Sequence, residues 1–202
     1  MSGVPVLIEG AGLRLLVVGG GAVATRKLFA FVEAGAHVRV VAPQATAEVR
    51  ALAEDGRITW LPRTYVPADI DDAELVIVAT DDRAVNAMAA ADARAMYRVV
   101  NVADAPEEGS FTMMAAHRSG ALVIGVSAGG LPGAAARIRD VIARRFDGRY
   151  ARALDALVEV RRAALSRGDG ARWRAFARRV LGRGFCRAVE EGTLEEQVTT
   201  WR

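Results

Sequence analysis

A block of glycines between an apolar run and a helix-like stretch constrains the fold of this chain more than any other feature. The apolar run Leu15–Val18 leads directly into Gly19-Gly20-Gly21-Ala22. Residues 24–34 then show helical apolar spacing, and Gly35 stands where a helix would be capped. A buried strand that turns through glycines into a helix is typical of a dinucleotide-binding turn, in which the helix N-terminus receives a pyrophosphate.

Each small residue of the block has a distinct expected role. Gly19 allows the tight turn, Gly21 lets backbone N–H groups approach a pyrophosphate, and Ala24 lets helix and strand pack closely. Arg26 and Lys27 would lie in the first turn of this helix, where cations oppose the helix dipole by ~0.3–1 kcal/mol each. Their presence there suggests an anion nearby. Lys27 is also the only lysine of the chain.

The first half of the chain alternates strand and helix signals. Strands are expected at 13–18, 37–41, 58–61, 75–79 and 98–102, and helices at 24–34, 44–54 and 83–94. Continuous apolar strands that alternate with helices predict an α/β fold with a Rossmann-like, doubly wound parallel sheet.

The pattern changes after Asp104. Extended segments are expected at 111–116 and 121–126, joined by Arg118-Ser119-Gly120, and a second glycine-rich turn covers 127–133. Helices are expected at 134–146, 151–166, 172–181 and 193–197. The predicted domains are therefore a nucleotide-binding domain at 1–110, a connecting segment at 111–147 and a helical domain at 148–202.

Polar residues at two strand ends mark the predicted ligand crevice, because ligands of open α/β sheets bind outside the carboxyl ends of the strands. Thr80-Asp81-Asp82 ends one strand, although both aspartates could be helix caps. Asp104 follows another strand and has no periodic helix to cap, so it could accept a proton from a substrate while a hydride leaves. The second strand ends in Pro43-Gln44 without the acid that would bind the ribose of NAD, and Arg39 is a weak candidate for a 2′-phosphate.

Composition excludes several other classes. The single cysteine, Cys186, rules out an intrachain disulfide and a cysteine-based metal cluster, and no histidine pair has ligand spacing. His37 is expected to be structural, and His117 is expected in a surface turn. No apolar run is long enough to span a bilayer, and a cytoplasmic protein is the default expectation. Between Arg144 and Arg187 stand thirteen arginines and four acids, which suit an acidic partner or a solvated face.

Several motifs together resemble the precorrin-2 dehydrogenase / sirohydrochlorin ferrochelatase family, the N-terminal module of siroheme synthase. They are Val17–Lys27 with its glycine-Arg-Lys block, Ala79-Thr80-Asp81-Asp82, Asn101-Val102-Ala103-Asp104-Ala105-Pro106 and Ser127-Ala128-Gly129-Gly130-Leu131-Pro132. The resemblance covers roughly residues 4–145 and continues more weakly through the helical tail.

The resemblance implies NAD-dependent oxidation of precorrin-2 to sirohydrochlorin for siroheme or cobalamin synthesis, and in some members insertion of Fe²⁺ or Co²⁺. It matches Asp104 to the family's essential proton-accepting aspartate. It also implies a homodimer formed through the segment after the nucleotide domain, with 111–126 as exchanged strands. Together with the crevice argument it gives candidate cofactor residues Gly19, Gly21, Ala22, Val23, Ala24, Pro43, Gln44, Thr80 and Asp81. The candidate substrate residues are Arg26, Lys27, Ser127, Gly129 and Gly130, and the arginine-rich second half suits the eight carboxylates of precorrin-2.

Two other classes of function remain possible from the sequence. A nucleotide-sensing regulatory domain uses a similar glycine turn, but it would need neither Asp104 nor the arginine-rich tail. A nucleic-acid binder on the same core would be expected to carry a recognition motif and interleaved aromatic residues, which the chain lacks.

Overall fold

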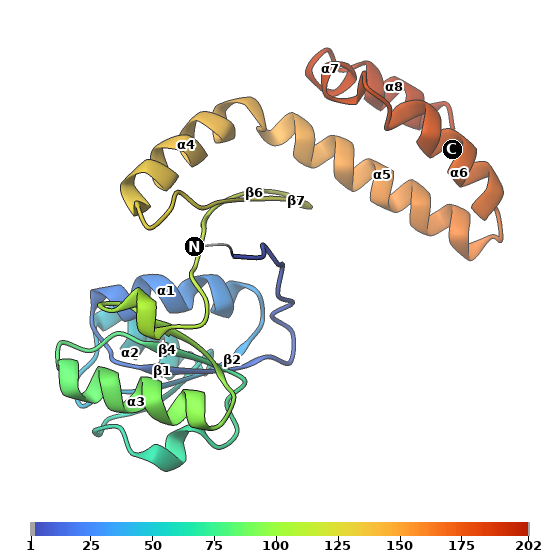
Figure 1. Ribbon diagram of the computed structural model, residues 1–202. Coiled ribbons are helices and arrows are strands. Elements are labelled where there is room, and N and C mark those ends of the chain that lie inside the picture. The colour runs from blue at the N-terminus through green and yellow to red at the C-terminus, as the bar shows by residue number, and fades with distance from the viewer. Residues whose placement is uncertain (1–2, 202) are drawn as a thin grey trace. The chain divides into compact units, whose positions relative to one another are not determined.

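The computed structural model describes residues 3–201 (Figure 1). The chain divides into two compact units, one formed by residues 4–113 and the other by the chain from Met114 onward. We call them the sheet unit and the helical unit. The prediction of an α/β, Rossmann-like fold with a helical C-terminal part is confirmed.

The sheet unit is a five-stranded parallel sheet in the order β3-β2-β1-β4-β5. Its strands are β1 (Arg14–Val18), β2 (His37–Val41), β3 (Thr59–Leu61), β4 (Leu75–Val78) and β5 (Val99–Val102). Its helices are α1 (Ala22–Glu33), α2 (Ala47–Glu54) and α3 (Arg83–Ala95), with short 3₁₀ turns η1 (Pro67–Ile70) and η2 (Pro106–Glu108). Because all strands run in one direction, their carboxyl ends lie along one edge.

Successive residues of the central strand point to opposite faces of this sheet, as the period of two requires. Leu15 and Val17 join the core under α1 and α2, whereas Leu16 and Val18 join the core under α3. All four side chains are almost completely buried. Continuous apolar strands are expected where both faces are covered, which explains why the strands were recognisable in the sequence.

Two helices of the sheet unit begin at other residues than the sequence predicts. Helix α1 begins at Ala22, with Gly21 as its N-cap, two residues before the predicted start. Arg26 and Lys27 therefore lie in the second turn, so the argument that they oppose the dipole in the first turn is wrong. Helix α2 begins at Ala47 because the Thr46 side chain caps it by accepting from the Val49 N–H.

The helical unit begins with an antiparallel pair of strands, β6 (Ala115–Ser119) and β7 (Leu122–Val126). Five helices follow: α4 (Pro132–Arg145), α5 (Gly148–Ser166), α6 (Gly170–Val180), α7 (Phe185–Glu190) and α8 (Thr193–Thr199). Residues of α5, α6, α7 and α8 share one apolar core, which includes Tyr150, Phe176 and Leu194. Helix α7 is absent from the sequence prediction, although the Phe185–Val189 spacing and the flanking Gly184 and Gly192 would have indicated it.

The strand pair is shifted along the sequence relative to its prediction. Strand β6 starts at Ala115 rather than at 111, and the turn falls at Gly120, whose φ is +56°. His117 was expected in the turn, but it lies within β6, and its Nε2 is 2.6 Å from the carbonyl oxygen of Phe146. The surface-turn interpretation of His117 is therefore wrong, since the histidine binds the end of α4.

The separation of a dimerisation segment from a helical domain within the second half remains a prediction. Within residues 3–201, no helix is long and apolar enough to cross a membrane.

An ion pair between the partly exposed Arg63 and the buried carboxylate of Asp69 makes a testable contribution to the stability of the sheet unit. The carboxylate of Asp69 is 5% exposed and accepts two hydrogen bonds from the Arg63 guanidinium, at 2.5 and 2.8 Å. These bonds lower the pKa of Asp69 below its ordinary 3.8. Asp69 therefore contributes stability at and above pH 4 that is lost as the pH falls through its lowered pKa.

We expect Asp69→Asn to reduce the free energy of unfolding by about 1–3 kcal/mol at pH 7, the range for hydrogen bonds to charged groups. Urea unfolding followed by circular dichroism at pH 7 and pH 3 measures this effect. The difference between variant and wild type should shrink at the lower pH. An equal difference at both pH values would show that the charge of Asp69 contributes nothing.

Candidate active site

A side chain would meet different surroundings at each of the three glycines after β1. Gly19 has a φ of +118°, and a Cβ there would lie 2.3 Å from the carbonyl oxygen of Ala79. A Cβ on Gly20 would lie 2.3 Å from the carbonyl oxygen of Gln44. A Cβ on Gly21 would meet no atom within 4 Å. Gly19 and Gly20 therefore serve the packing of the turn, whereas the space beside Gly21 is open to a ligand.

Hydrogen bonds tie this glycine turn to the loop between β2 and α2. The Thr46 N–H donates to the Gly20 carbonyl at 2.9 Å, and the Thr46 and Thr25 hydroxyls are 3.0 Å apart. The Thr25 hydroxyl also bonds the Gly21 carbonyl at 3.0 Å. On the other side of the loop, the indole of Trp60 donates to the Ala42 carbonyl at 3.0 Å. The turn and the loop are thus held in one arrangement before any ligand binds.

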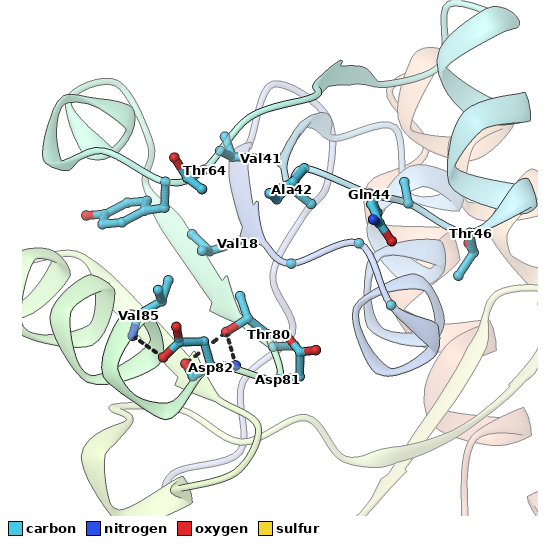
Figure 2. A pocket seen from close by; sticks show the side chains of 17 residues that line it. Val18, Val41, Ala42, Gln44, Thr46, Thr64, Thr80, Asp81, Asp82 and Val85 are labelled. Atoms are coloured by element: carbon cyan, nitrogen blue, oxygen red, sulfur yellow. Dashed lines mark hydrogen bonds between the residues drawn. The ribbon is translucent and has the colours of Figure 1, made fainter.

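A pocket of about 700 Å³ opens at the carboxyl edge of the sheet, between the glycine turn, the β2–α2 loop and the end of β4 (Figure 2). Figure 2 shows Gln44 and Thr46 on the loop side and Thr80, Asp81 and Asp82 at the end of β4. Of the candidate cofactor residues, Gly19, Gly21, Pro43, Gln44, Thr80 and Asp81 line this pocket. Ala22, Val23 and Ala24 lie on α1 outside its lining, and Ala24 is fully buried in the core.

A buried asparagine, Asn86, holds the turn after β4, and the sequence alone indicated no role for it. Asn86 is fully buried, and its Oδ1 accepts from the Thr80 hydroxyl at 2.6 Å and from the Thr80 N–H at 3.1 Å. Asp82 caps α3 by accepting from the N–H groups of Ala84 and Val85, and Figure 2 shows the bond from Val85. The capping interpretation therefore holds for Asp82, which leaves Asp81 free to face the pocket.

Asp104 lies two residues beyond β5 at the same edge of the sheet, but it does not line the pocket. It caps no helix, since η2 starts from Ala105 without a side-chain cap. Its side chain is 38% exposed, and its Oδ2 is 3.9 Å from Nε of Arg83. The same guanidinium bonds the carboxylate of Glu108. Asp104 is thus an accessible carboxylate that caps no helix, and its exposed oxygens could accept a proton from a substrate.

Lys27 reaches from α1 to the end of β5 instead of pointing into solvent. Its Nζ donates to Oδ1 of Asn101 at 2.8 Å, and Nδ2 of Asn101 donates to the Phe111 carbonyl at 2.9 Å. Burial, and then the charge of Arg26, lower the pKa of Lys27. Arg26 is exposed on the same helix. The two cations assigned to substrate therefore have different surroundings, one held by the strand and one free to move.

The lowered pKa of the only lysine is directly measurable. Reductive methylation with ¹³C-formaldehyde labels Lys27 and the N-terminal amine, and Lys27→Arg identifies which signal is which. We expect the Lys27 signal to titrate below 10.5, the ordinary value. Since the unfolded chain then binds more protons, stability should rise with pH up to about that value. A signal that titrates at or above 10.5 would contradict the buried environment.

Arg39 does not fit the role considered for it. Its guanidinium lies 2.5 Å from the Asp72 carboxylate and donates to the Asp69 carbonyl at 2.7 Å, and it does not line the pocket. A role in binding a 2′-phosphate is therefore wrong for this residue. Ser127, Gly129 and Gly130 belong to the helical unit, in the turn between β7 and α4, where both glycines have positive φ angles.

Tyr65 is a pocket residue that the sequence did not reveal. It is 6% exposed, lines the pocket beside Thr64 and donates its hydroxyl to Asp92 at 2.9 Å. Burial, followed by the bond to Asp92, raises the pKa of Tyr65. It lies in the connection between β3 and η1, a segment without periodicity, so no sequence signal placed it at the site.

The geometry can be compared with known proteins. Residues 6–115 match the model of a family described as putative NAD(P)-binding. The siroheme synthase of Pseudomonas putida (strain W619) is 43% identical over 130 residues, which cover 64% of this chain and 28% of that protein. The siroheme synthase of Methylobacillus flagellatus is 34% identical over 199 residues, which cover 98% of this chain and 41% of that protein. The chain thus spans about a quarter to two fifths of the length of these relatives.

A solved structure gives the corresponding comparison over the whole fold. The chain is similar to SirC, a precorrin-2 dehydrogenase, with a TM-score of 0.78 and 25% sequence identity. The match covers 98% of this chain and 99% of SirC. The resemblance to the siroheme synthase family is therefore confirmed, and it extends through the helical unit.

Proposed function

Because the chain belongs to the family of putative NAD(P)-binding proteins, we propose that it oxidises precorrin-2 to sirohydrochlorin with NAD. The observation that carries the proposal is Asp104, an accessible carboxylate at the sheet edge where the glycine turn also opens, with no helix to cap. The substrate class is supported by the similarity to siroheme synthases and to a precorrin-2 dehydrogenase.

The residues at the glycine turn fit a dinucleotide. The space beside Gly21 is open, and α1 begins with neither a side-chain cap nor an acid in its first turn, so its N–H groups can receive a pyrophosphate. The adenosine half would lie in the pocket against Pro43, Gln44 and Thr46. No lysine or arginine is among the residues that line the pocket, which favours NAD over its 2′-phosphorylated form.

Bound NAD supplies the hydride acceptor for the reaction. Precorrin-2 loses two hydrogens, one as a hydride and one as a proton, so the products are sirohydrochlorin, NADH and H⁺. We assign the proton to a carboxylate oxygen of Asp104, from which it passes to solvent because the side chain is partly exposed. The chain's own task is thus to hold the reacting carbon between the cofactor and Asp104.

The carboxylates of the tetrapyrrole require cations, which the chain offers mainly as arginine. Arg26 is exposed on α1 of the sheet unit. Within the helical unit, α5 and α6 carry exposed arginines, among them Arg161, Arg162 and Arg174. Guanidinium groups bind carboxylates in two-point contacts, which suits a polycarboxylate better than a single charge. The turn with Ser127, Gly129 and Gly130 is proposed to contact the substrate, and a homodimer in the cytoplasm is proposed for the protein.

Tetrapyrrole binding distinguishes the proposed enzyme from the alternative, a nucleotide-sensing regulatory domain. Purified protein should bind both NAD and sirohydrochlorin, measured by calorimetry and by absorbance titration under anaerobic conditions. It should also convert precorrin-2 to sirohydrochlorin only when NAD is present. Binding of NAD without binding or turnover of a tetrapyrrole would support the regulatory domain and contradict the enzyme. Metal insertion, which the family resemblance implies for some members, is tested as a separate activity by adding Fe²⁺ or Co²⁺ to bound sirohydrochlorin and following the absorbance.

A further inference from the structure

Arg83 stands between two carboxylates at the sheet edge, and no role in cofactor binding accounts for it. It is the first residue of α3, Asp104 follows β5, and Glu108 is the last residue of η2. Its Nη2 bonds Oε1 of Glu108, while its Nε lies 3.9 Å from Oδ2 of Asp104. The guanidinium is thus hydrogen-bonded to Glu108 and is near Asp104 without a hydrogen bond.

Other hydrogen bonds fix the backbone on both sides of this contact. Asp82 caps α3 and fixes the backbone from which Arg83 extends. The backbone of Glu108 is fixed because Nη1 of Arg94 donates to its carbonyl at 2.6 Å. Gly109 lets this loop lie close to β5, since a Cβ there would lie 2.9 Å from the Val100 carbonyl oxygen. The Arg83–Glu108 bond therefore joins two fixed segments, α3 and the loop that follows Asp104.

The arrangement has a consequence for Asp104. A guanidinium at hydrogen-bond distance would occupy the carboxylate oxygens in a two-point contact and leave them poorly available to a substrate proton. At 3.9 Å the cation still attracts the carboxylate and restrains its direction, but the oxygens stay open. Glu108 keeps Arg83 at this distance by occupying its Nη2.

We propose that Arg83 is a positioning residue for Asp104, and that Glu108 prevents its guanidinium from closing onto the Asp104 carboxylate. The inference rests on the proposed dehydrogenase function. Since Arg83 acts on Asp104 and not on the nucleotide, its loss lowers kcat and leaves NAD binding unchanged. Since Glu108 acts through Arg83, its removal has an effect only while Arg83 is present.

The test measures kcat and KM for precorrin-2, the Kd for NAD and the Kd for sirohydrochlorin in four variants. They are Arg83→Met, Arg83→Lys, Glu108→Gln and the double variant Arg83→Met/Glu108→Gln. We expect Arg83→Met to lower kcat about ten- to a hundredfold, the loss that a misplaced reacting group produces, with both Kd values and Tm unchanged. Arg83→Lys should recover much of kcat because the charge is kept. Glu108→Gln should lower kcat alone but add nothing to Arg83→Met.

Arg57→Met is the matched control, because Arg57 is an exposed arginine of the same unit beside β3. It should behave as the wild type. Wild-type kcat in Arg83→Met, parallel losses of kcat, NAD binding and Tm, or additive effects in the double variant would each overturn the inference. In those cases the wild type still turns over, so the proposed function stands. A wild type that neither oxidises precorrin-2 nor binds sirohydrochlorin would contradict the proposed function, and the inference with it.

Discussion

Asp104→Asn is expected to lower kcat for precorrin-2 oxidation by ~10²–10⁴, the usual contribution of a general base. Asparagine has almost the same shape, and it keeps the position at the carboxyl edge of the sheet, but it cannot accept the proton. The Kd for NAD should stay within about twofold of wild type, since a twofold change is only ~0.4 kcal/mol and Asp104 does not line the pocket. Anaerobic turnover measurements and calorimetric titration with NAD provide the two quantities.

Glu107→Gln is the matched control for this substitution. Glu107 is an exposed carboxylate three residues further along the chain, and the same change of charge there should leave kcat unchanged. If Asp104→Asn retains wild-type kcat, the assigned proton acceptor is wrong. If both variants lose activity equally, the effect is the general charge of the loop and not the Asp104 carboxylate.

Alanine substitutions at Gly20 and Gly21 are expected to have different effects, one on stability and the other on NAD affinity. Gly20→Ala places a Cβ 2.3 Å from the Gln44 carbonyl oxygen, a backbone atom that cannot move alone. We expect it to lower the free energy of unfolding by about 1–3 kcal/mol, the usual cost of overpacking. Gly21→Ala places its Cβ in open space, so the protein should fold with wild-type stability. The added methyl would instead obstruct the pyrophosphate and raise the Kd for NAD about tenfold or more, ~1.4 kcal/mol.

Thermal unfolding without ligand and NAD titration, carried out on both variants, measure these two effects independently. Reversed results, with Gly21→Ala unstable and Gly20→Ala selectively weak in NAD binding, would show that the ligand does not lie beside Gly21. Wild-type NAD affinity in Gly21→Ala would mean that the pyrophosphate approaches the turn elsewhere.

The sequence was informative where physical constraints act locally. The strand Leu15–Val18 is buried on both faces, so its continuous apolar run was readable, and the glycines that follow it obey steric limits visible in the residue types alone. The α/β fold, its parallel strands and the confirmed family resemblance all come from such features. Asp104 stood out for the same reason, because it follows a strand and no periodic helical stretch comes directly after it.

Contacts between residues far apart in the chain could not be predicted in this way. The bond from Lys27 to Asn101 joins residues 74 positions apart, and the Arg83–Glu108 bond spans 25. Tyr65 reaches the pocket from a segment without periodicity, and His117 binds the end of α4 because β6 continues to Ser119, beyond the predicted strand end at 116. Each depends on how the strands and helices pack, and one sequence alone does not contain that information. Which candidate site residues touch a ligand stays a prediction.

The proposed function requires that the chain couple NAD reduction to precorrin-2 oxidation, and the stoichiometry of one sealed reaction measures this coupling. Precorrin-2, NAD and the wild-type protein are mixed without oxygen, and NADH and sirohydrochlorin are quantified from the same sample. We expect about one NADH for each sirohydrochlorin, because one hydride is transferred in each turnover. Sirohydrochlorin that forms without NADH, or at the rate found without protein, would contradict it.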